Sequence, residues 1–175
     1  MEKTLTRKRV FDGKLLKIDL LDVELDNGKT SKREIICHPG AAVIWAKLPD
    51  ERFVLVRQYR KAVDEYFIEA IAGTLDPGEL PEICAERELT EETGYKSIKM
   101  TKLGIVAPSP GYTEELFHIY YAELNPAQGA NNLDDDENIE VLYYTAEQID
   151  KMIQTGKICD AKTIVAWHLY QNIHK

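Results

Sequence analysis

The apolar and polar residues of the chain follow a strand-like pattern over most of its length. Residues 14–25 alternate loosely, an Asn-Gly turn signal follows at 26–29, and the alternation resumes at 31–38, which together predict a hairpin. Two apolar runs on either side of Pro49 predict a second hairpin. Those two runs and the further extended stretches are expected at 41–48, 52–59, 65–73, 99–106, 115–124 and 138–145.

Between these stretches, one central segment has helical spacing. Pro81 suits the first turn of a helix, and Gly94 is a natural stop signal after its last turn. Between them, Ala85, Leu89 and Thr93 recur at intervals of four residues and would lie on one face. We therefore expect a central helix that packs this face against the strands.

Two further helices are expected to close the chain. One begins near Ala146 and ends near Thr155, and Asp160 is expected to cap the other. The apolar side of the last helix is predicted to comprise Ile164, Val165, Leu169 and Ile173, with Trp167 at its edge. Because strands dominate, the predicted class is α+β, an α/β/α sandwich on a mixed sheet with an N-terminal antiparallel β region.

Composition and charge narrow the function classes. The chain has 175 residues, 44% of them apolar, which suits one globular domain with a small appended lobe. It contains no run of about 18 apolar residues, so no membrane partner is expected. Three widely spaced cysteines form no metal or disulfide pattern, and a cytoplasmic location is expected. The net charge of −8 argues against nucleic acid, and an anionic substrate would need a metal or local arginines.

Carboxylates crowd one face of the predicted central helix. Glu88, Glu91 and Glu92 have i, i+3 and i+4 spacing, which points them at one small volume. Like charges at this spacing destabilise a helix by roughly 0.2–0.5 kcal/mol per pair. The row is either a solvated acidic face or a set of hard oxygen ligands for Mg²⁺. The helix alone does not decide between these readings.

The loop before the helix favours metal ligands over a solvated acidic face. Residues 72–79, AGTLDPGE, lead directly into the helix and complete the pattern G-x5-E-x7-R-E-U-x-E-E-x-G-U, where U is a bulky apolar residue. This pattern resembles the signature of the Nudix hydrolases. Tyr95 at the last U is a departure, which we interpret as a packing change. The matching residues are Gly73, Glu79, Arg87, Glu88, Leu89, Glu91, Glu92 and Gly94.

The resemblance implies a metal site and its chemistry. Glu88 and Glu92 match the principal metal-binding glutamates, and Glu91 matches a third that binds or orients a metal-bound water. The carbonyl of Ala72 matches a backbone ligand. The implied cofactor is Mg²⁺, with Mn²⁺ as a substitute, and the implied reaction is attack of water on a phosphorus of a pyrophosphate.

The resemblance also implies a structural pair beside this site. Gly73, Glu79 and Arg87 match structural residues, and the last two match a pair in which the arginine holds the loop at 72–79 onto the helix. A bidentate arginine fixes geometry better than a lysine does. The alternative for these two residues is an ordinary surface ion pair.

Other stretches resemble the ADP-ribose pyrophosphatase subgroup of this family. Pro110 follows Gly94 by sixteen residues, within a Ser-Pro-Gly loop that would otherwise be a plain turn. The segment at 58–60 matches Q-[FY]-R, and 69–73 matches E-[IL]-P-A-G except at Ala70 and Ile71, where the proline is missing. The residues implied to lie near the substrate are Arg33, Arg60, Glu69, Pro110 and Glu115. For Arg60, the alternative is a solvent-facing strand arginine.

An acidic stretch precedes the last predicted strand. Glu137 matches a glutamate proposed in the subgroup as general base or metal ligand, with Asp135 and Asp136 as fallbacks. By itself the stretch would usually be a solvated loop.

The N-terminal region resembles the subgroup as well, at residues 32–42. There the N-terminal strands exchange between two subunits, and Arg33 would reach the partner's adenosine site. We accordingly expect residues 1–40 to form an N-terminal β region that makes a homodimer, and residues 41–175 to form the Nudix domain.

The resemblance therefore implies Mg²⁺-dependent hydrolysis of ADP-ribose to AMP and ribose 5-phosphate. One alternative is a pyrophosphatase for another nucleotide sugar, such as GDP-mannose. Another is a Nudix-like module that senses a nucleotide without cleaving it. Intact carboxylates at 88, 91 and 92 speak against a pure binder, which has no need for the like-charge repulsion.

Overall fold

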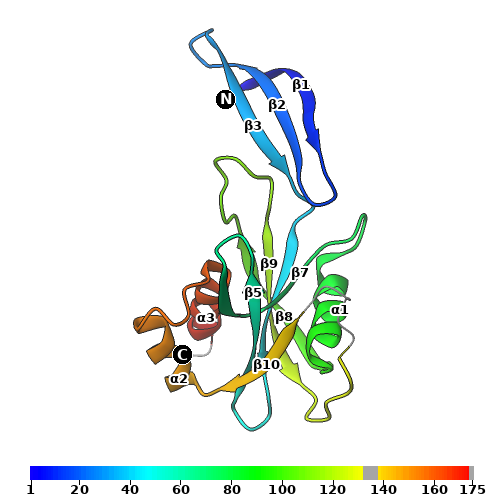
Figure 1. Ribbon diagram of the computed structural model, residues 1–175, viewed down its shortest axis with the longest axis vertical. Helices are drawn as coiled ribbons and strands as arrows, with labels where there is room; N and C mark the ends of the chain where they lie inside the picture. The colour runs from blue at the N-terminus through cyan, green and yellow to red at the C-terminus, as the bar shows by residue number, and fades with distance from the viewer. Residues whose placement is uncertain (132–137, 174–175) are drawn as a thin grey trace. The chain divides into compact units, whose positions relative to one another are not determined.

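The computed structural model describes residues 1–131 and 138–173, which form two compact units (Figure 1). The first unit combines Met1–Gly40 with Ala107–Leu116. The second runs from Ala41 to Val106 and resumes at Phe117. The segment 107–116 thus groups with the N-terminal residues, and each unit is described by itself.

The first unit is a three-stranded antiparallel sheet in the order β1-β2-β3. Its strands are β1 (Lys3–Asp12), β2 (Lys17–Glu24) and β3 (Thr30–Cys37). The 107–116 segment joins the end of β3, where the Ile36 amide donates to the Tyr112 carbonyl at 2.8 Å. Strand β1 was missed by the pattern of apolar residues, because all ten of its residues are exposed and no buried face imposes an alternation.

The second unit contains a seven-stranded mixed sheet. Its central path is β10-β5-β4-β9-β8, with β6 paired to β5 and β7 paired to β4. Strands β4 and β9 are parallel, and the other pairs are antiparallel. The strands are β4 (Ala41–Lys47), β5 (Phe53–Arg60), β6 (Glu65–Glu69), β7 (Ile71–Thr74), β8 (Ser97–Val106), β9 (Phe117–Leu124) and β10 (Ile139–Tyr144).

Helices cover both faces of this sheet, as Figure 1 shows: α1 (Pro81–Thr93) on one, α2 (Ala146–Gln154) and α3 (Ala161–Ile173) on the other. Alternate residues of β4 serve the two sides. Ile44 packs in the core with Leu89 of α1, while Trp45 packs with Trp167 of α3. Burial on both faces explains why β4 reads as a continuous apolar run. The predicted α/β/α sandwich with a mixed sheet is therefore confirmed.

The buried face of α3 differs from the predicted one. Trp167 is central to the core, where its ring lies 5.3 Å from those of Trp45 and Phe53, whereas Ile173 is exposed. The fully buried side of the helix comprises Thr163, Ala166, Trp167 and Tyr170. Apolar residues surround α3 on several sides, so their spacing alone did not identify the side that is most deeply buried.

The predicted single stretch at 65–73 is two strands with a break at Ala70. Strand β6 ends at Glu69 against β5, and β7 begins at Ile71 against β4. The chain changes partner strand at this corner and then enters the loop that leads to α1.

Helix α1 begins at Pro81 and ends at Thr93, with Gly94 as the stop residue after its last turn, as predicted. Gly94 has a φ of 72°, its amide donates to the Thr90 carbonyl at 2.8 Å, and its carbonyl accepts from the Gly129 amide at 2.8 Å. The helix end is therefore tied both to its own last turn and to the chain at 128–129. No helix within the described residues is long and apolar enough to cross a membrane.

We expect Leu89→Ala to lower the free energy of unfolding by about 2–5 kcal/mol, because Leu89 is fully buried between α1 and the sheet. Ile83→Ala is the matched control, since Ile83 lies on the same helix with 56% of its surface exposed. The control should change stability by less than about 0.5 kcal/mol. Urea denaturation of the two variants measures the difference, and equal losses would contradict this account of the core.

Candidate functional site

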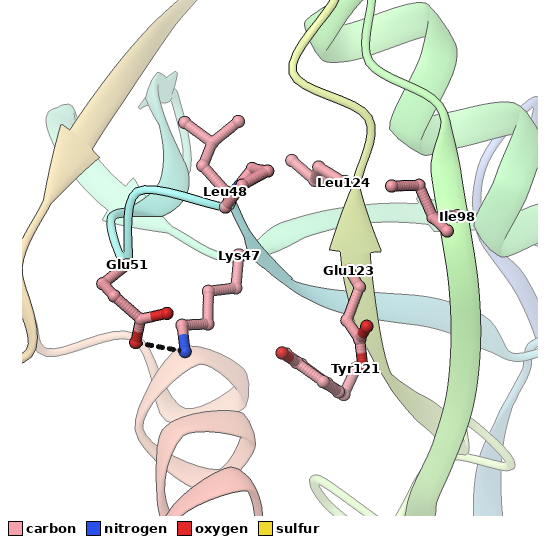
Figure 2. A pocket seen from close by; sticks show the side chains of 8 residues that line it. Lys47, Leu48, Glu51, Ile98, Tyr121, Glu123 and Leu124 are labelled. Atoms are coloured by element: carbon pink, nitrogen blue, oxygen red, sulfur yellow. Dashed lines mark ion pairs between the residues drawn. The ribbon is translucent and has the colours of Figure 1, made fainter.

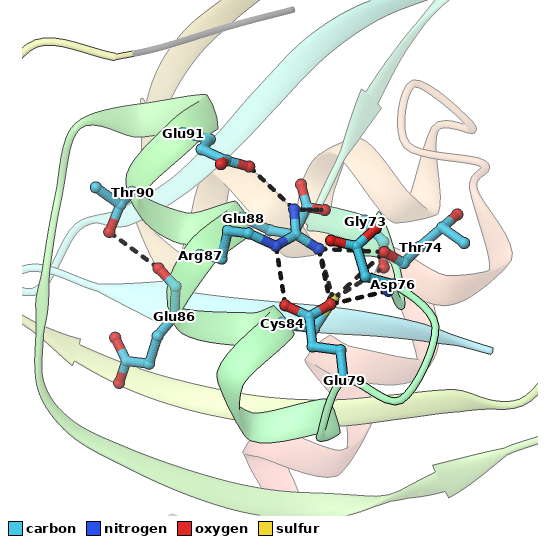
Figure 3. A network of polar contacts seen from close by, with 10 residues as sticks. All are labelled: Gly73, Thr74, Asp76, Glu79, Cys84, Glu86, Arg87, Glu88, Thr90 and Glu91. Carbon is cyan, nitrogen blue, oxygen red and sulfur yellow. Dashed lines mark hydrogen bonds and ion pairs between the residues drawn. The ribbon is translucent and has the colours of Figure 1, made fainter. Parts of the chain in front are cut away.

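Arg87 joins the end of β7 and the loop that follows it to helix α1 (Figure 3). Its Nε and Nη2 donate to the two carboxylate oxygens of Glu79, each at 2.9 Å, and Nη2 also donates to the Thr74 carbonyl at 3.2 Å. The Glu79 carboxylate in turn accepts from the Asp76 amide at 2.9 Å. This fork-shaped pairing gives Arg87 the geometry of the predicted loop-holding residue.

The third nitrogen of the same guanidinium faces the carboxylates of the helix. Nη1 of Arg87 donates to Glu88 Oε1 at 2.7 Å and to Glu91 Oε2 at 3.0 Å (Figure 3). One cation thus pairs with three carboxylates, two from α1 and one from the loop. The like-charge repulsion between Glu88 and Glu91 is partly offset by this shared positive charge.

Gly73 allows the Glu88 carboxylate to lie directly against the loop. A Cβ at position 73 would stand 1.8 Å from the carboxyl carbon of Glu88 and 1.8 Å from its Oε1. A side chain there would have to push Glu88 away. The glycine of the motif is therefore required for space, not for an unusual backbone angle.

The oxygen donors at this site suit a hard divalent cation. Glu88 fills the cradle beside Gly73, Glu91 is one turn further along α1, and Glu92 is buried on the same helix. Carboxylates and a loop carbonyl are the ligand types that Mg²⁺ prefers. Among the residues that the structure describes, no three His, Cys, Asp or Glu side chains converge as a ready-made cluster. In this arrangement Glu88 and Glu91 are paired with Arg87 instead.

A second charged cluster surrounds Glu69, whose side chain is only 2% exposed. Arg60 binds it in a fork, with Nε to Oε1 at 2.7 Å and Nη2 to Oε2 at 2.6 Å. Lys162 of α3 donates to the same Oε2, and its side chain is 11% exposed. Burial works to raise the pKa of Glu69, but the Arg60 hydrogen bonds and the Lys162 charge outweigh it, so the pKa lies below its usual value.

This cluster lies within electrostatic reach of the helix carboxylates. The hydrogen bonds from Arg60 to Glu69 raise the pKa of Arg60, and the charge of Glu92 adds to that shift. Of this cluster, Arg60 and Glu69 were predicted near the substrate, whereas Lys162 was missed. Lys162 and Glu69 are 93 residues apart, so no local pattern in the sequence signalled this contact.

The remaining predicted residues lie in the first unit or outside the described residues. Arg33 pairs with Glu2, at 3.1 Å from Nε to Oε2. Glu115 Oε1 lies 3.7 Å from His38 Nε2. Pro110 lies in the 107–116 segment of the first unit. Glu137, with its fallbacks Asp135 and Asp136, lies outside the described residues. The roles of all these residues stay predictions.

A cavity of about 460 Å³ lies elsewhere in the second unit, at the end of β4 (Figure 2). Lys47 and Glu51, which both line it, form an ion pair at 2.6 Å. Its described lining contains no residue of α1 or of the loop at 72–79. The carboxylate site is therefore built on a loop and a helix face, separately from this cavity.

Comparison with known proteins defines the class. The NUDIX domain family model matches residues 38–166, so the chain belongs to the Nudix family, and the predicted membership among its hydrolases is confirmed.

Individual relatives cover most of the chain. It is 42% identical to an ADP-ribose pyrophosphatase of Bacillus subtilis and 41% identical to a methanol dehydrogenase activator of Bacillus methanolicus. Each alignment spans 166 residues, 94% of this chain and 90% of the relative. It is also 38% identical to a GDP-mannose pyrophosphatase of Escherichia coli K12, over 77% of this chain and 74% of that protein.

A solved structure supports the fold. A crystal structure of an ADP compounds hydrolase superposes with a TM-score of 0.83 and covers 98% of this chain and 92% of its own. Its sequence is 22% identical, so the likeness concerns the fold.

We expect Glu79→Gln to lower the melting temperature most near neutral pH. The hydrogen bond from Arg87 lowers the pKa of Glu79 to about 2, from a usual value of 4.5. The stabilisation from the ionised form is complete above the higher of these values and is lost as the pH falls towards the lower one. Melting curves between pH 7 and pH 3 should show the gap to wild type narrowing below about pH 4.5. A gap that stays constant would contradict the assignment, and exposed Glu82→Gln on the same helix is the control.

We further expect Mg²⁺ to raise the melting temperature, because a ligand of the folded state stabilises it. Glu88→Gln replaces a carboxylate ligand by a neutral amide, and Gly73→Ala displaces the Glu88 side chain. Both changes should reduce the increase in melting temperature. Glu82→Gln removes an equal charge at an exposed position of α1 and should leave it unchanged. Differential scanning calorimetry at several Mg²⁺ concentrations measures the response. An undiminished increase in Gly73→Ala would place the ion elsewhere.

Proposed function

We propose that this protein hydrolyses the pyrophosphate bond of ADP-ribose to give AMP and ribose 5-phosphate. The observation that carries the proposal is the loop–helix platform, in which Gly73 seats Glu88 and Arg87 clasps the loop. The 42% identity to an ADP-ribose pyrophosphatase over nearly the whole chain supports the choice of substrate.

The metal partner in this proposal is Mg²⁺, with Mn²⁺ as a substitute. Glu88, Glu91, Glu92 and the carbonyl of Ala72 would hold it. When bound, the ion would neutralise the phosphates and activate water for attack on phosphorus.

The protein's own residues orient the reactants. Arg87 and Glu79 fix the loop, so that the Ala72 carbonyl and Glu88 keep their separation before substrate arrives. Glu91 is proposed to orient the attacking water, and Glu137 to accept its proton as general base. These roles agree with the donor chemistry of the site.

Arg60 is the proposed contact to the substrate's phosphates. Its Nε and Nη2 are engaged by Glu69, and no residue among those described accepts from its Nη1. The side chain is 42% exposed, which leaves part of it open to solvent. An arginine already held by a carboxylate is pre-organised for a phosphate. This local cation also answers the problem that a protein of net charge −8 has in attracting a diphosphate.

The protein is further proposed to act as a homodimer in the cytoplasm. Strand β1 pairs only with β2 among the described strands and exposes Leu5, Val10 and Phe11, which suits contact with a second copy. In that dimer Arg33, Pro110 and Glu115 would contribute to the substrate site. Three free cysteines agree with a reducing compartment.

The alternatives are a pyrophosphatase for another nucleotide sugar and a Nudix module that senses a nucleotide without cleaving it. Relatives named GDP-mannose pyrophosphatase and methanol dehydrogenase activator match the chain at 38% and 41% identity, so identity alone does not select the substrate. A panel of ADP-ribose, GDP-mannose, NADH, diadenosine polyphosphates and nucleoside triphosphates with Mg²⁺ separates the readings. We expect the fastest turnover with ADP-ribose. Faster turnover of GDP-mannose would overturn the substrate, and no turnover at all would favour a binder.

Glu92→Gln is the control for catalysis in that panel. It should lower kcat by a factor on the order of 10² or more while the melting temperature shows an intact fold. The exposed Glu82→Gln should retain the wild-type rate. A near-wild-type rate in Glu92→Gln would remove Glu92 from the proposed metal site.

A further inference from the structure

The start of α3 docks on the corner between β6 and β7. Asp160 caps the helix, with its Oδ2 accepting from the Thr163 amide at 2.9 Å and from the Thr163 hydroxyl. The same Thr163 oxygen accepts from the Ala70 amide at 2.7 Å, and Thr163 is fully buried. The break in the strand is thus hydrogen-bonded to a helix that lies 93 residues later in the chain.

The neighbouring residue on α3 holds the other side of the corner. Lys162 donates to Glu69 Oε2 and lies 3.1 Å from Asp160 Oδ1. We call Asp160, Lys162 and Thr163 the α3 clamp. The clamp therefore fixes two consecutive residues, Glu69 by charge and Ala70 through its amide.

Those two residues are connected to both parts of the proposed site. Glu69 receives the fork of Arg60, so the position of its carboxylate sets the direction of the Arg60 guanidinium. Ala70 leads after one residue to Ala72 and Gly73, where the proposed carbonyl ligand and the Glu88 cradle lie. A shift of the corner would therefore misplace the anion-binding group and the metal loop together.

We propose that Lys162 and Thr163 are positioning residues, which act through Glu69 and Ala70 to pre-organise Arg60 and residues 72–73 of β7. Lys162 neutralises part of the charge on Glu69, so a carboxylate with almost no exposure stays ionised and keeps Arg60 oriented. Thr163 satisfies an amide that the break between β6 and β7 leaves without a strand partner. The inference rests on the proposed function for the identity of the anion, but the positioning itself does not.

The first test needs no substrate. Hydrogen exchange measured by mass spectrometry on wild-type protein should show protected amides at 69–73. Thr163→Val, which keeps shape and charge, and Lys162→Met should both accelerate exchange there. Lys157→Met, at an exposed lysine just before α3, should not. Unchanged protection in Thr163→Val would overturn the proposal, and this variant decides the matter even if Lys162→Met does not fold.

The second test asks whether Lys162 acts through Arg60. Lys162→Met should raise KM for ADP-ribose about tenfold with kcat changed less than about threefold, because orientation of a charged contact is lost. In an Arg60→Gln background, the same change should add little, since the residue through which it acts is gone. Equal, additive effects in both backgrounds would mean that Lys162 acts independently of Arg60 and would overturn the positioning role.

The two tests separate failure of the inference from failure of the proposed function. If wild-type protein turns over none of the panel, the proposed function fails, and hydrogen exchange still decides on the clamp. If turnover is normal but Thr163→Val exchanges like wild type, the clamp fails and the function stands.

Discussion

One guanidinium holds the proposed catalytic platform together. Arg87 uses all three of its nitrogens, two towards the loop and one towards the carboxylates of α1. Glu79 and Glu88 are both largely buried, so each depends on this cation for compensation. Without it, the loop would lose its attachment and the helix would keep its repulsion. Together with the pairing of β7 to β4, this interaction keeps Gly73 and Glu88 side by side.

The same principle recurs at Glu69, where two cations compensate one buried carboxylate. The two clusters divide the electrostatic work of an acidic protein that handles an anion. In the proposed function, the first cluster would concentrate negative charge for a divalent cation. At the second, Arg60, which Glu69 holds in a fork, would contact a phosphate. A net charge of −8 thus says little about the local field at the site.

Contacts between residues that are close in the sequence could be predicted, and contacts between distant residues could not. The residues from Gly73 to Gly94 lie within the end of one strand, one loop and one helix, so their spacing in sequence translates directly into spacing in space. Lys162 and Glu69 are 93 residues apart, and no local pattern in a single sequence reports such a contact. Strand β1 was not predicted for a different reason. All of its residues are exposed, so its sequence shows no alternation of apolar and polar residues. The prediction of the buried face of α3 was wrong because the helix is oriented by aromatic packing of Trp167 with Trp45 and Phe53, which residue spacing does not report.

Gly94 has a consequence for how the family signature can vary. The position meets two separate demands: a left-handed backbone angle, and an approach so close that an added Cβ would stand 2.3 Å from the Gly129 carbonyl oxygen. Asparagine tolerates the first demand in many helix ends, yet it carries a Cβ and fails the second. The obstacle here is backbone, which cannot swing aside as a side chain does. Position 94 therefore excludes even asparagine, which helix termini usually accept. Sequence changes at 128–129 are restricted as well, because the backbone there lies against this glycine.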